Sequence, residues 1–468
     1  MDCRRHVRLL VLAASCACAP ARAPADEAKR PPDVVLIVID ALRWDHVGCY
    51  GYGRPTTPNL DRLAGEGVRF EQVAAASSWT MPGVMTLFTS LPPFRHGVTR
   101  SLSTLREGLT TLAAEFRRAG YQTGGITSNP MTSGKLGFGH GFEFYDDATL
   151  IFDVPLDPLQ AGGPARNTYQ RSTSEDVTRL GLKWVAGRDR SRPFFLHLLY
   201  FDPHNDYLPP PEYARPFVDP AYDGPQDGAG IGGLRGRTLP EKDRRHLVDL
   251  YDGEVRCTDA FVGRLLEGLK DLDAAGDLVV AVVADHGEEF MDHGDWTHGY
   301  TLYEEVSRVP WILWAPGRVP AGTVVRRQAT HLDLMPTLLA VAGLPIPAQC
   351  QGRDLRPWWV AGAAPAGPEA PAFQELDLSS GLWLAVREGR RKAIVGKEPD
   401  KPQYYALDED PGEHHNLAGT PREREFSAEL KEIGEYSARI AKFVGAATKA
   451  TGIDPRLLEQ IKSLHYVQ

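Results

Sequence analysis

The sequence predicts an α/β fold in which a mainly parallel sheet is sandwiched by helices, followed by a small C-terminal antiparallel α+β subdomain. Three observations predict it. Four apolar segments have the length and β-branched composition of buried strands. Amphipathic helical segments alternate with them, which is typical of a parallel sheet covered on both faces. Short strand-like segments near the C-terminus, without long helices between them, indicate the antiparallel part.

The elements follow in chain order, beginning with PDVVLIVID at 32–40. This apolar run ends on Asp40, which is typical of a strand buried on both faces with a carboxylate at its C-terminal edge. TPNLDRLAGEGVRF (57–70) predicts a short amphipathic helix and then a strand. LTTLAAEFRRAG predicts a helix that Gly120 ends, and YQTGGITS predicts the next strand.

Three more strands and a long helix complete the large sheet. PFFLHLLYFDPH (193–204) repeats the first pattern, an apolar strand that runs into polar residues. A helix with one apolar side is predicted over about 240–272. DLVVAVVADHG (277–287) and VPWILWAPG (309–317) predict the third and fourth strands of this kind. In such sheets ligands bind at the carboxyl ends of the strands. We therefore expect the polar side chains at those ends to meet, namely Asp40, His204, Asp285 and His286.

A proline- and alanine-rich passage, WWVAGAAPAGPEAPA, marks a boundary after the large sheet. Beyond it, LWLAVREG, RKAIVG and QYYALD predict short strands, and a helix follows. We divide the chain into an N-terminal leader (1–25), a large domain (31–345) and a C-terminal subdomain that completes the fold (370–468).

The leader has the features of an export signal: a basic start, a short apolar core and small residues. AASC, ending at Cys16, fits a lipoprotein attachment signal, whereas APA at 19–21 fits an ordinary cleavage site. We expect an exported protein, either periplasmic or lipid-anchored at the cell envelope. Nothing later in the sequence is long and apolar enough to cross a bilayer, so a lipid anchor is the one membrane contact expected.

The formal net charge of −9, without a basic block, argues against nucleic acid or an anionic membrane surface as a partner. Any anion that the protein handles must therefore be held locally, by a metal or by a few cations. Outside the leader the cysteines are Cys49, Cys257 and Cys350, an odd number at wide spacing, which implies no disulfide framework.

Asp40, Asp285 and His286 form the strongest local signal for chemistry. Carboxylates at the tips of two buried strands cost several kcal/mol of desolvation unless a positive charge lies between them. A divalent metal satisfies both, and an Asp-His pair supplies adjacent ligands of different hardness. The alternative is that each acid caps the helix that follows it.

Thr80 lies in the stretch SSWTMPG, just before an apolar run. Threonine is a good N-cap, and Pro82 falls in the first turn, so one interpretation is helix initiation alone. A helix start is also where anions bind, because its backbone N–H groups and dipole point at them. Beside a divalent cation, the Thr80 hydroxyl would face an anionic ester as an activated nucleophile.

The stretch VLIVIDALRWDHVGCYGYGRPTTPNLDRLAGEGVRFEQVAAASSWTMPGVMTLFTSLPPFRHGV resembles the N-terminal block of the sulfatase family, within the alkaline phosphatase superfamily. The likeness continues in order through YFDPHNDYLPP, LYDGEVRCTDAFVGRLLEGL, VVADHGEEFMDHGDWTHGYTLYEEVSRVP, HLDLMPTLLAVAGLP and YYALDEDPGEHHNL. It covers nearly the whole chain after the leader. The resemblance implies the alkaline phosphatase-like fold, a metal-dependent hydrolase of sulfate or phosphate esters, and an anionic ester of a small molecule, glycan or lipid headgroup as substrate.

Carried over residue by residue, the resemblance implies that Asp40, Asp285 and His286 bind the metal and that Thr80 occupies the nucleophile position. With Thr80, the implied metal ligands number four. One carboxylate fewer than in a calcium sulfatase, together with a histidine, favours one Mn²⁺ or Zn²⁺ ion, with Ca²⁺ as the alternative.

The resemblance also implies roles for four residues around the metal. His204 matches a histidine that contacts the transferred group, and His298 matches one that contacts the anion or the leaving oxygen. Arg43 matches the arginine of a D-x-L-R segment, as a supporting or substrate-binding residue. Lys135, in SGKLGFGHGF, is a loose match for a substrate-binding lysine.

The sequence departs from the family at the nucleophile. Sulfatases usually carry Cys-x-Pro-Ser-Arg or Ser-x-Pro-x-Arg there, and the Cys or Ser is oxidised to formylglycine. This chain has TMPGV at 80–84, so Thr80 cannot yield that aldehyde and Val84 replaces the arginine. A second metal-binding Asp is replaced by Ala41. Relatives with Thr at this position include lipoteichoic-acid synthases, phosphoethanolamine transferases and nucleotide phosphodiesterases, which act on phosphoesters.

These departures favour a Thr-dependent phosphoester hydrolase or transferase with a covalent intermediate. Without the aldehyde, water must attack that intermediate directly, with one of the two histidines as base and the other as acid to the leaving oxygen. Two alternatives stay open from the sequence: a true sulfate-ester hydrolase, and a non-catalytic member of the family. Glu288 and Glu289 are expected to cap a helix, and His293, His414 and His415 to be solvated loop residues.

Overall fold

The computed structural model describes residues 30–147, 172–272, 276–360, 369–396 and 401–443, together with Gly367 and Leu458. Eight strands form one sheet in the order β10-β2-β9-β6-β1-β5-β3-β4. All neighbouring pairs in it are parallel except the two that involve β9, so the predicted mainly parallel sheet is confirmed. Its strands are β1 (Asp33–Ile39), β2 (Val68–Ala74), β3 (Gln122–Thr127), β4 (Phe144–Asp146), β5 (Phe194–Tyr200), β6 (Leu278–Ala284), β9 (Trp311–Trp314) and β10 (Thr323–Thr330).

The core of the sheet explains where the polar residues meet. Strands β1, β5 and β6 are buried along their whole length, as their continuous apolar sequences predict. In the parallel register, Ile39 lies beside Tyr200 on one side and Ala284 on the other. The next residues of β1 and β6, Asp40 and Asp285, therefore leave the sheet side by side at the same edge.

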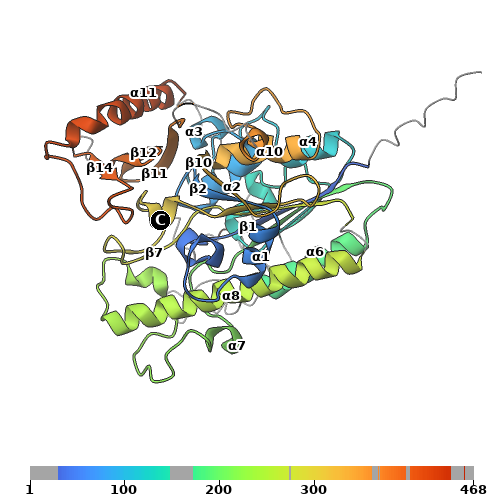
Figure 1. Ribbon diagram of the computed structural model, residues 1–468, viewed down its shortest axis with the longest axis horizontal. Coiled ribbons are helices and arrows are strands. Elements are labelled where there is room, and N and C mark those ends of the chain that lie inside the picture. Colours follow the sequence, from blue (N-terminus) through green and yellow to red (C-terminus); the bar gives the residue numbers. More distant parts are fainter. Residues whose placement is uncertain are drawn as a thin grey trace, which may run out of the picture.

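Helices cover both faces of the sheet (Figure 1). On one face lie α1 (Pro58–Glu66), α6 (Ser174–Ala186) and α8 (Glu241–Asp271), the long helix that the sequence predicts. On the other lie α2 (Thr80–Thr89), α4 (Leu112–Arg118) and α10 (Leu334–Val341). The α2 helix is buried at all ten positions, which fits its apolar sequence between the sheet and its neighbours.

Shorter elements lie between these. The short helices are α3 (Pro93–His96), α7 (Pro211–Ala214) and α9 (Glu304–Ser307), and β7 (Glu289–Phe290) and β8 (Trp296–Thr297) form a two-stranded hairpin. The 3₁₀ turns are η1 (Trp44–His46), η2 (Gly48–Tyr50), η3 (Pro130–Thr132), η4 (Gly134–Leu136), η5 (Ile231–Leu234), η6 (His331–Asp333), η7 (Arg356–Trp358) and η8 (Glu423–Phe426).

The C-terminal subdomain is a four-stranded antiparallel sheet with helix α11 (Ser427–Phe443) against it (Figure 1). Its strands are β11 (Ala372–Leu378), β12 (Gly381–Glu388), β13 (Arg391–Val395) and β14 (Gln403–Ala406). Three of them and the helix are the predicted elements, whereas β11 was not predicted. The subdomain joins the large sheet near the start of α2, where the Glu375 N–H donates to the Ala76 carbonyl at 2.9 Å.

Several expectations fall on parts of the chain that the structure does not describe. The leader (1–25), with both of its alternative signals, and the segment after residue 443 lie outside the described residues apart from Leu458. Among the helices described, none combines the length and the apolar composition needed to cross a membrane. Cys49, Cys257 and Cys350 form no disulfide, in agreement with their spacing.

Candidate active site

The Asp40, Asp285 and His286 side chains meet at the carboxyl ends of β1 and β6, as the sequence predicts. All three are fully buried, and one ligand atom from each lies within 4.8 Å of the other two. The His286 Nε2 atom is 3.3 Å from Asp40 Oδ1 and 3.6 Å from Asp285 Oδ2. This is the geometry in which one cation contacts all three residues.

The hydrogen bonds of this triad leave one oxygen of each acid without a donor. Asp285 Oδ1 accepts from the Ala41 and His286 backbone N–H groups, but Asp285 Oδ2 and Asp40 Oδ1 are buried with no hydrogen-bond partner. The His286 ring bonds the Gly287 carbonyl through Nδ1 at 2.7 Å, which orients Nε2 toward the acids. Two orphaned carboxylate oxygens and an oriented imidazole nitrogen fit a divalent cation.

The pKa shifts in the triad also indicate that a positive charge between the two carboxylates is favourable. Burial, together with the charge of Asp40, raises the pKa of Asp285 to about 7. Burial opposes ionisation of Asp40 too, but the close approach of the His286 ring and the charges of the neighbouring histidines lower the pKa of Asp40. Burial disfavours protonated His286, yet the two carboxylates raise the pKa of this ring to about 9. A cation bound here would therefore displace a proton from His286.

The Thr80 hydroxyl lies at the triad. Its Oγ1 atom is 3.3 Å from His286 Nε2, and the side chain is fully buried. Thr80 is the first helical residue of α2, and the N-cap position is Trp79, so the interpretation of Thr80 as the helix cap is wrong. Gly83 allows this close approach, because a Cβ atom there would lie 2.7 Å from the Asp285 carbonyl oxygen. The first turn of α2 thus sits directly on the end of β6.

Asn129 is a site residue that the sequence reasoning missed. It follows β3 at the same edge of the sheet, and its Oδ1 caps η3 by accepting from the Met131 N–H at 2.8 Å. Its Nδ2 donates to Asp40 Oδ2 at 2.5 Å and lies 3.5 Å from Thr80 Oγ1. The available signal was its position, directly after a predicted strand and before a proline.

His204 and His298 lie together beside the triad, with ring centroids 4.7 Å apart. The His298 ring is also 4.1 Å from that of His286. Each ring is oriented through Nδ1, in His204 by the Asn205 carbonyl at 2.7 Å and in His298 by Glu288 Oε1 at 2.8 Å. Burial lowers the pKa of His204 to about 4 and the pKa of His298 well below its usual value.

The hairpin that carries His298 corrects three expectations. Glu288 and Glu289 cap no helix; Glu289 begins β7, and Glu288 is the carboxylate that orients His298. His293 is not a solvated loop residue, because its ring stacks on Tyr303 and bonds Glu305 Oε1 at 2.6 Å. His414 and His415, by contrast, are exposed as expected.

Arg43 and Lys135 do not contact the triad among the described residues. The Arg43 guanidinium is buried between Asp45 and Asp292, at 2.8 and 2.7 Å, and also donates to the Glu288 carbonyl. These contacts favour the supporting role rather than direct substrate binding. Lys135 is exposed on η4, so its match to a substrate-binding lysine gains no support from the structure.

Ala41, which stands where the family has a second metal-binding Asp, takes a left-handed conformation with φ of 54°. Its N–H donates to Asp285 Oδ1 and its carbonyl accepts from the Tyr251 hydroxyl. The same hydroxyl accepts from the Arg43 N–H. Tyr251 thus holds the backbone turn that follows Asp40 from the side of α8.

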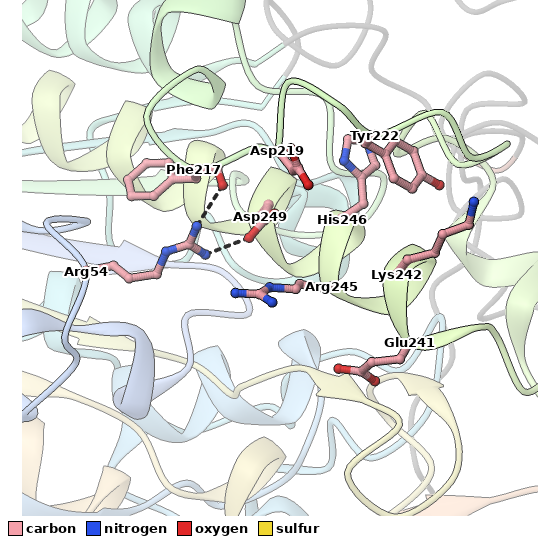
Figure 2. A pocket seen from close by; sticks show the side chains of 9 residues that line it. All are labelled: Arg54, Phe217, Asp219, Tyr222, Glu241, Lys242, Arg245, His246 and Asp249. Atoms are coloured by element: carbon pink, nitrogen blue, oxygen red, sulfur yellow. Dashed lines mark hydrogen bonds and ion pairs between the residues drawn. The ribbon is translucent and has the colours of Figure 1, made fainter.

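A separate cavity of about 500 Å³ lies at the start of α8, where Phe217 and Tyr222, from the chain after α7, line its other side (Figure 2). Side chains that line it already have partners within the protein. Arg54 bonds Asp249 at 2.8 Å, and the Tyr222 ring stacks on His246 with centroids 3.7 Å apart. Neither a triad residue nor one of the two site histidines lines it, so it is distinct from the candidate reaction centre.

Comparisons with known proteins agree with this geometry. The family model described as Sulfatase matches residues 32–344, and one described as N-sulphoglucosamine sulphohydrolase, C-terminal, matches 292–437. The chain is 25% identical to an arylsulfatase of Clostridium perfringens, covering 86% of this chain and 93% of that one. It is 28% identical to human arylsulfatase A, covering 92% of each. The solved phosphonate monoester hydrolase of Agrobacterium radiobacter has the same fold, with a TM-score of 0.70 at 22% identity over 88% of this chain and 96% of that one.

Proposed function

The chain belongs to the sulfatase family of the alkaline phosphatase superfamily and is an ester-hydrolysing enzyme, and from this premise we propose that it cleaves an anionic ester with Thr80 as nucleophile, phosphoesters being preferred. The observation that carries the proposal is the Thr80 hydroxyl at 3.3 Å from His286, beside two carboxylates with orphaned oxygens. Hydrolysis and transfer to another acceptor share the same first step. The substrate is the ester of a small molecule, a glycan or a lipid headgroup.

Asp40, Thr80, Asp285 and His286 would hold one divalent metal ion, with Mn²⁺ or Zn²⁺ preferred over Ca²⁺ because the set includes an imidazole and only two carboxylates. When bound, the ion would lower the pKa of the Thr80 hydroxyl and offset the negative charge of the ester. Asn129 supports this set by holding Asp40 and facing Thr80. Its amide leaves Asp40 Oδ1 as the oxygen directed at the ion.

The first chemical step is in-line attack by Thr80 Oγ1 on phosphorus or sulfur. The Thr80 hydroxyl gives up its proton to solvent before the attack; a bond then forms between Oγ1 and the phosphorus or sulfur as the bond to the leaving oxygen breaks, and the N-terminal turn of α2 faces the non-bridging oxygens. We assign the proton donor to His298: burial lowers the pKa of this ring in the free protein, but its carboxylate partner Glu288 and the negative charge of a bound ester would both stabilise the protonated form. His204 then activates water, which releases Thr80.

The preference for phosphorus follows from residue 80. Formylglycine enzymes release sulfate by re-forming an aldehyde. Thr80 cannot form that aldehyde, and the sequence has no Cys near it. A threonine ester must be cleaved by water, which suits phosphoryl transfer better than sulfuryl transfer. Sulfate-ester hydrolysis is the second candidate, because the relatives at 25% and 28% identity are named arylsulfatases. An exported protein, periplasmic or lipid-anchored, is proposed on its leader sequence.

The first prediction tests the nucleophile. Thr80→Ala should abolish turnover while leaving folding intact, whereas Thr89→Ala, a deletion of the same hydroxyl in the same buried helix, should retain activity. Activity is measured on matched aryl phosphomonoester, phosphodiester and sulfate substrates, with metal content determined on the purified protein. Normal turnover by Thr80→Ala would refute the proposal, and faster turnover of the sulfate would select the second candidate.

A further inference from the structure

A segment of the loop before α8, residues 228–236, contacts both of the loops that carry the site histidines; we call it the bridging segment. At one end, the Tyr207 N–H donates to the Gly228 carbonyl and the Ile231 N–H to Asp206 Oδ1, each at 2.9 Å. At the other end, the Gly236 N–H donates to Asp295 Oδ1 at 3.0 Å. The Arg235 guanidinium donates to the other oxygen of that carboxylate at 3.1 Å.

The first end is anchored close to His204. Asp206 is buried and lies two residues beyond that histidine. The approach to Tyr207 is tight, because a Cβ atom on Gly228 would lie 2.0 Å from the Tyr207 carbonyl oxygen, and Gly228 has a φ of 89°. A side chain at this position would push the bridging segment off the His204 loop.

The second end contacts residues that precede and follow His298 in the sequence. Asp295 lies in the turn of the β7–β8 hairpin, and its Oδ1 also accepts from the Trp296 N–H at 2.9 Å. Arg235 stacks over the ring of Tyr300, with the guanidinium carbon 3.2 Å from the ring centroid. The bridging segment therefore touches the chain three residues before and two residues after His298.

Between its two ends the bridging segment is the 3₁₀ turn η5, which begins at Ile231 and ends at Leu234, both buried. A turn of this kind rises by about 2.0 Å per residue, so it spans about 8 Å as a short stiff unit. A flexible linker of the same length would leave the two loops independent of each other. A hydrogen-bonded turn fixed at both ends transmits the position of one loop to the other.

We propose that Asp206 and Asp295 are positioning residues that act through the bridging segment to fix the spacing of His204 and His298. The inference rests on the proposed function in one respect, the use of His298 as proton donor to the leaving oxygen. Proton transfer needs heavy atoms about 2.6–3.2 Å apart. Loops held separately would let each of the two rings, whose centroids now lie 4.7 Å apart, move away from the ester or water oxygen with which it exchanges a proton.

The hairpin has other attachments, so loss of the bridge is not loss of the fold. Arg43 bonds Asp292 at 2.7 Å, and His293 bonds Glu305 at 2.6 Å. Both contacts are independent of the bridging segment. Variants that remove a contact at one end of the bridging segment should therefore keep β7 and β8 in place while His298 loses its fixed orientation.

The test is a double-mutant cycle with Asp206→Ala and Asp295→Ala, assayed with aryl esters of a good leaving group (p-nitrophenyl) and a poor one (unsubstituted phenyl). Proton donation matters only for the poor leaving group. Each single variant should lower kcat for the phenyl ester by about tenfold or more relative to kcat for the p-nitrophenyl ester, with KM unchanged. The double variant should be no worse than the more affected single variant, because one cut already releases the bridge.

The matched control is Asp227→Ala, which removes a carboxylate of the same loop that caps only its own turn at Ala229. Equal losses for both leaving groups, additive losses in the double variant, or the same profile in Asp227→Ala would overturn the proposal. A failure of the proposed function is recognised separately, by turnover in Thr80→Ala. Hydrogen exchange gives a readout without turnover: Asp295→Ala should speed exchange of the Tyr207 amide at the far end, and an unchanged rate contradicts the bridge.

Discussion

Asn129 joins two of the oxygen-bearing residues of the site, because one amide group faces both Asp40 and Thr80. Without it, Asp40 Oδ2 would be a second buried oxygen of that carboxylate lacking a donor, and the side chain would be free to turn. Outer partners of this kind typically change metal affinity by about 10–100-fold when they are removed. The residue is therefore as much a part of the predicted metal site as the acids are.

We expect Asn129→Ala to weaken Mn²⁺ or Zn²⁺ binding by about 10–100-fold, measured by calorimetric titration of metal-free protein. The reason is the lost donor to Asp40 and not a lost ligand. Ser133→Ala is the matched control, because Ser133 caps the adjoining turn η4 in the way Asn129 caps η3 and bonds none of the triad. Equal affinity in Asn129→Ala and wild type would show that Asp40 needs no support from this amide.

At the residue scale, the sequence predicted the side chains that lie at strand ends and missed several that hold side chains of the site region in place through hydrogen bonds. Asp40, Asp285 and His286 could be found because parallel strands bring their ends to one edge. Glu288 and His293 were misjudged because their partners, His298 and Glu305, lie 10 and 12 residues away across a hairpin that periodicity does not reveal. A two-residue strand such as β7 leaves no alternation to detect.

At the scale of elements, strand β11 carries a buried acid that couples the subdomain to the site-bearing helix region. Glu375 accepts from the Tyr436 hydroxyl of α11 at 2.6 Å and from the Phe94 N–H of α3 at 3.1 Å. Its carbonyl accepts from Ser77, three residues before Thr80. Burial raises the pKa of Glu375 to about 8, so the folded protein holds a proton there at neutral pH.

This predicts a stability that depends on pH. An ordinary glutamate in the unfolded chain has a pKa near 4.3, so between about pH 4.5 and pH 8 the folded state binds a proton that the unfolded state has lost. The contribution of Glu375 is therefore full below pH 4.5 and declines as pH rises to 8. Glu375→Gln has an amide oxygen that can accept from the Phe94 N–H and an NH2 group that can donate to the Tyr436 hydroxyl. It should be more stable than wild type at pH 9 by a few kcal/mol, on the order expected for such a shift, and similar at pH 5.

Urea unfolding at pH 5 and pH 9 measures the difference between the two proteins at each pH. The control is Asp377→Asn, two residues along the same strand, whose salt bridge with Arg100 is partly exposed and worth about 1 kcal/mol or less. A Glu375→Gln protein with the same pH slope as wild type would mean that Glu375 is ionised in the fold.

Strand β11, which the sequence did not predict, shows why an element can be missed. Its residues AFQELDL follow a proline- and alanine-rich passage, and the polar Gln374 and Glu375 are buried, so apolar alternation is broken in the middle of the strand. Strand β9 differs from the prediction in another way: it was predicted as a fourth strand like the others, but it lies antiparallel between β2 and β6. Strand direction depends on the connection through space, which a local pattern does not contain.

At the scale of the whole molecule, the C-terminal subdomain packs against the large domain (Figure 1), and buried charged side chains meet between them. The Lys392 ammonium of β13 lies 3.1 Å from Glu304 of α9 and 3.1 Å from Glu413, all three buried. Arg387 of β12 adds a second cation at Glu304, at 3.3 Å. Because α9 follows the hairpin that carries His298, this contact ties the subdomain to the site.

The sequence could predict both parts of this arrangement but not their junction. Apolar strands and helices are specified by local patterns, whereas Lys392 and Glu304 are 88 residues apart and each alone resembles a surface charge. Burial of such groups becomes visible only when the partner is known. These buried charges give a physical cause for the packing of the antiparallel sheet against the large domain.

The last prediction concerns this junction. Lys392→Met should destabilise the protein by about 3–5 kcal/mol, because it leaves Glu304 and Glu413 buried with one cation fewer between them. Lys431→Met, which removes an exposed partner of Glu435 on α11, should cost about 1 kcal/mol or less and serves as the control. Urea unfolding measures both. The double replacement Lys392→Met and Glu413→Gln should recover much of the loss, since it removes one carboxylate together with the cation and leaves Glu304 paired with Arg387. A loss that persists in the double variant would show that packing around Lys392, and not its charge, joins the two parts.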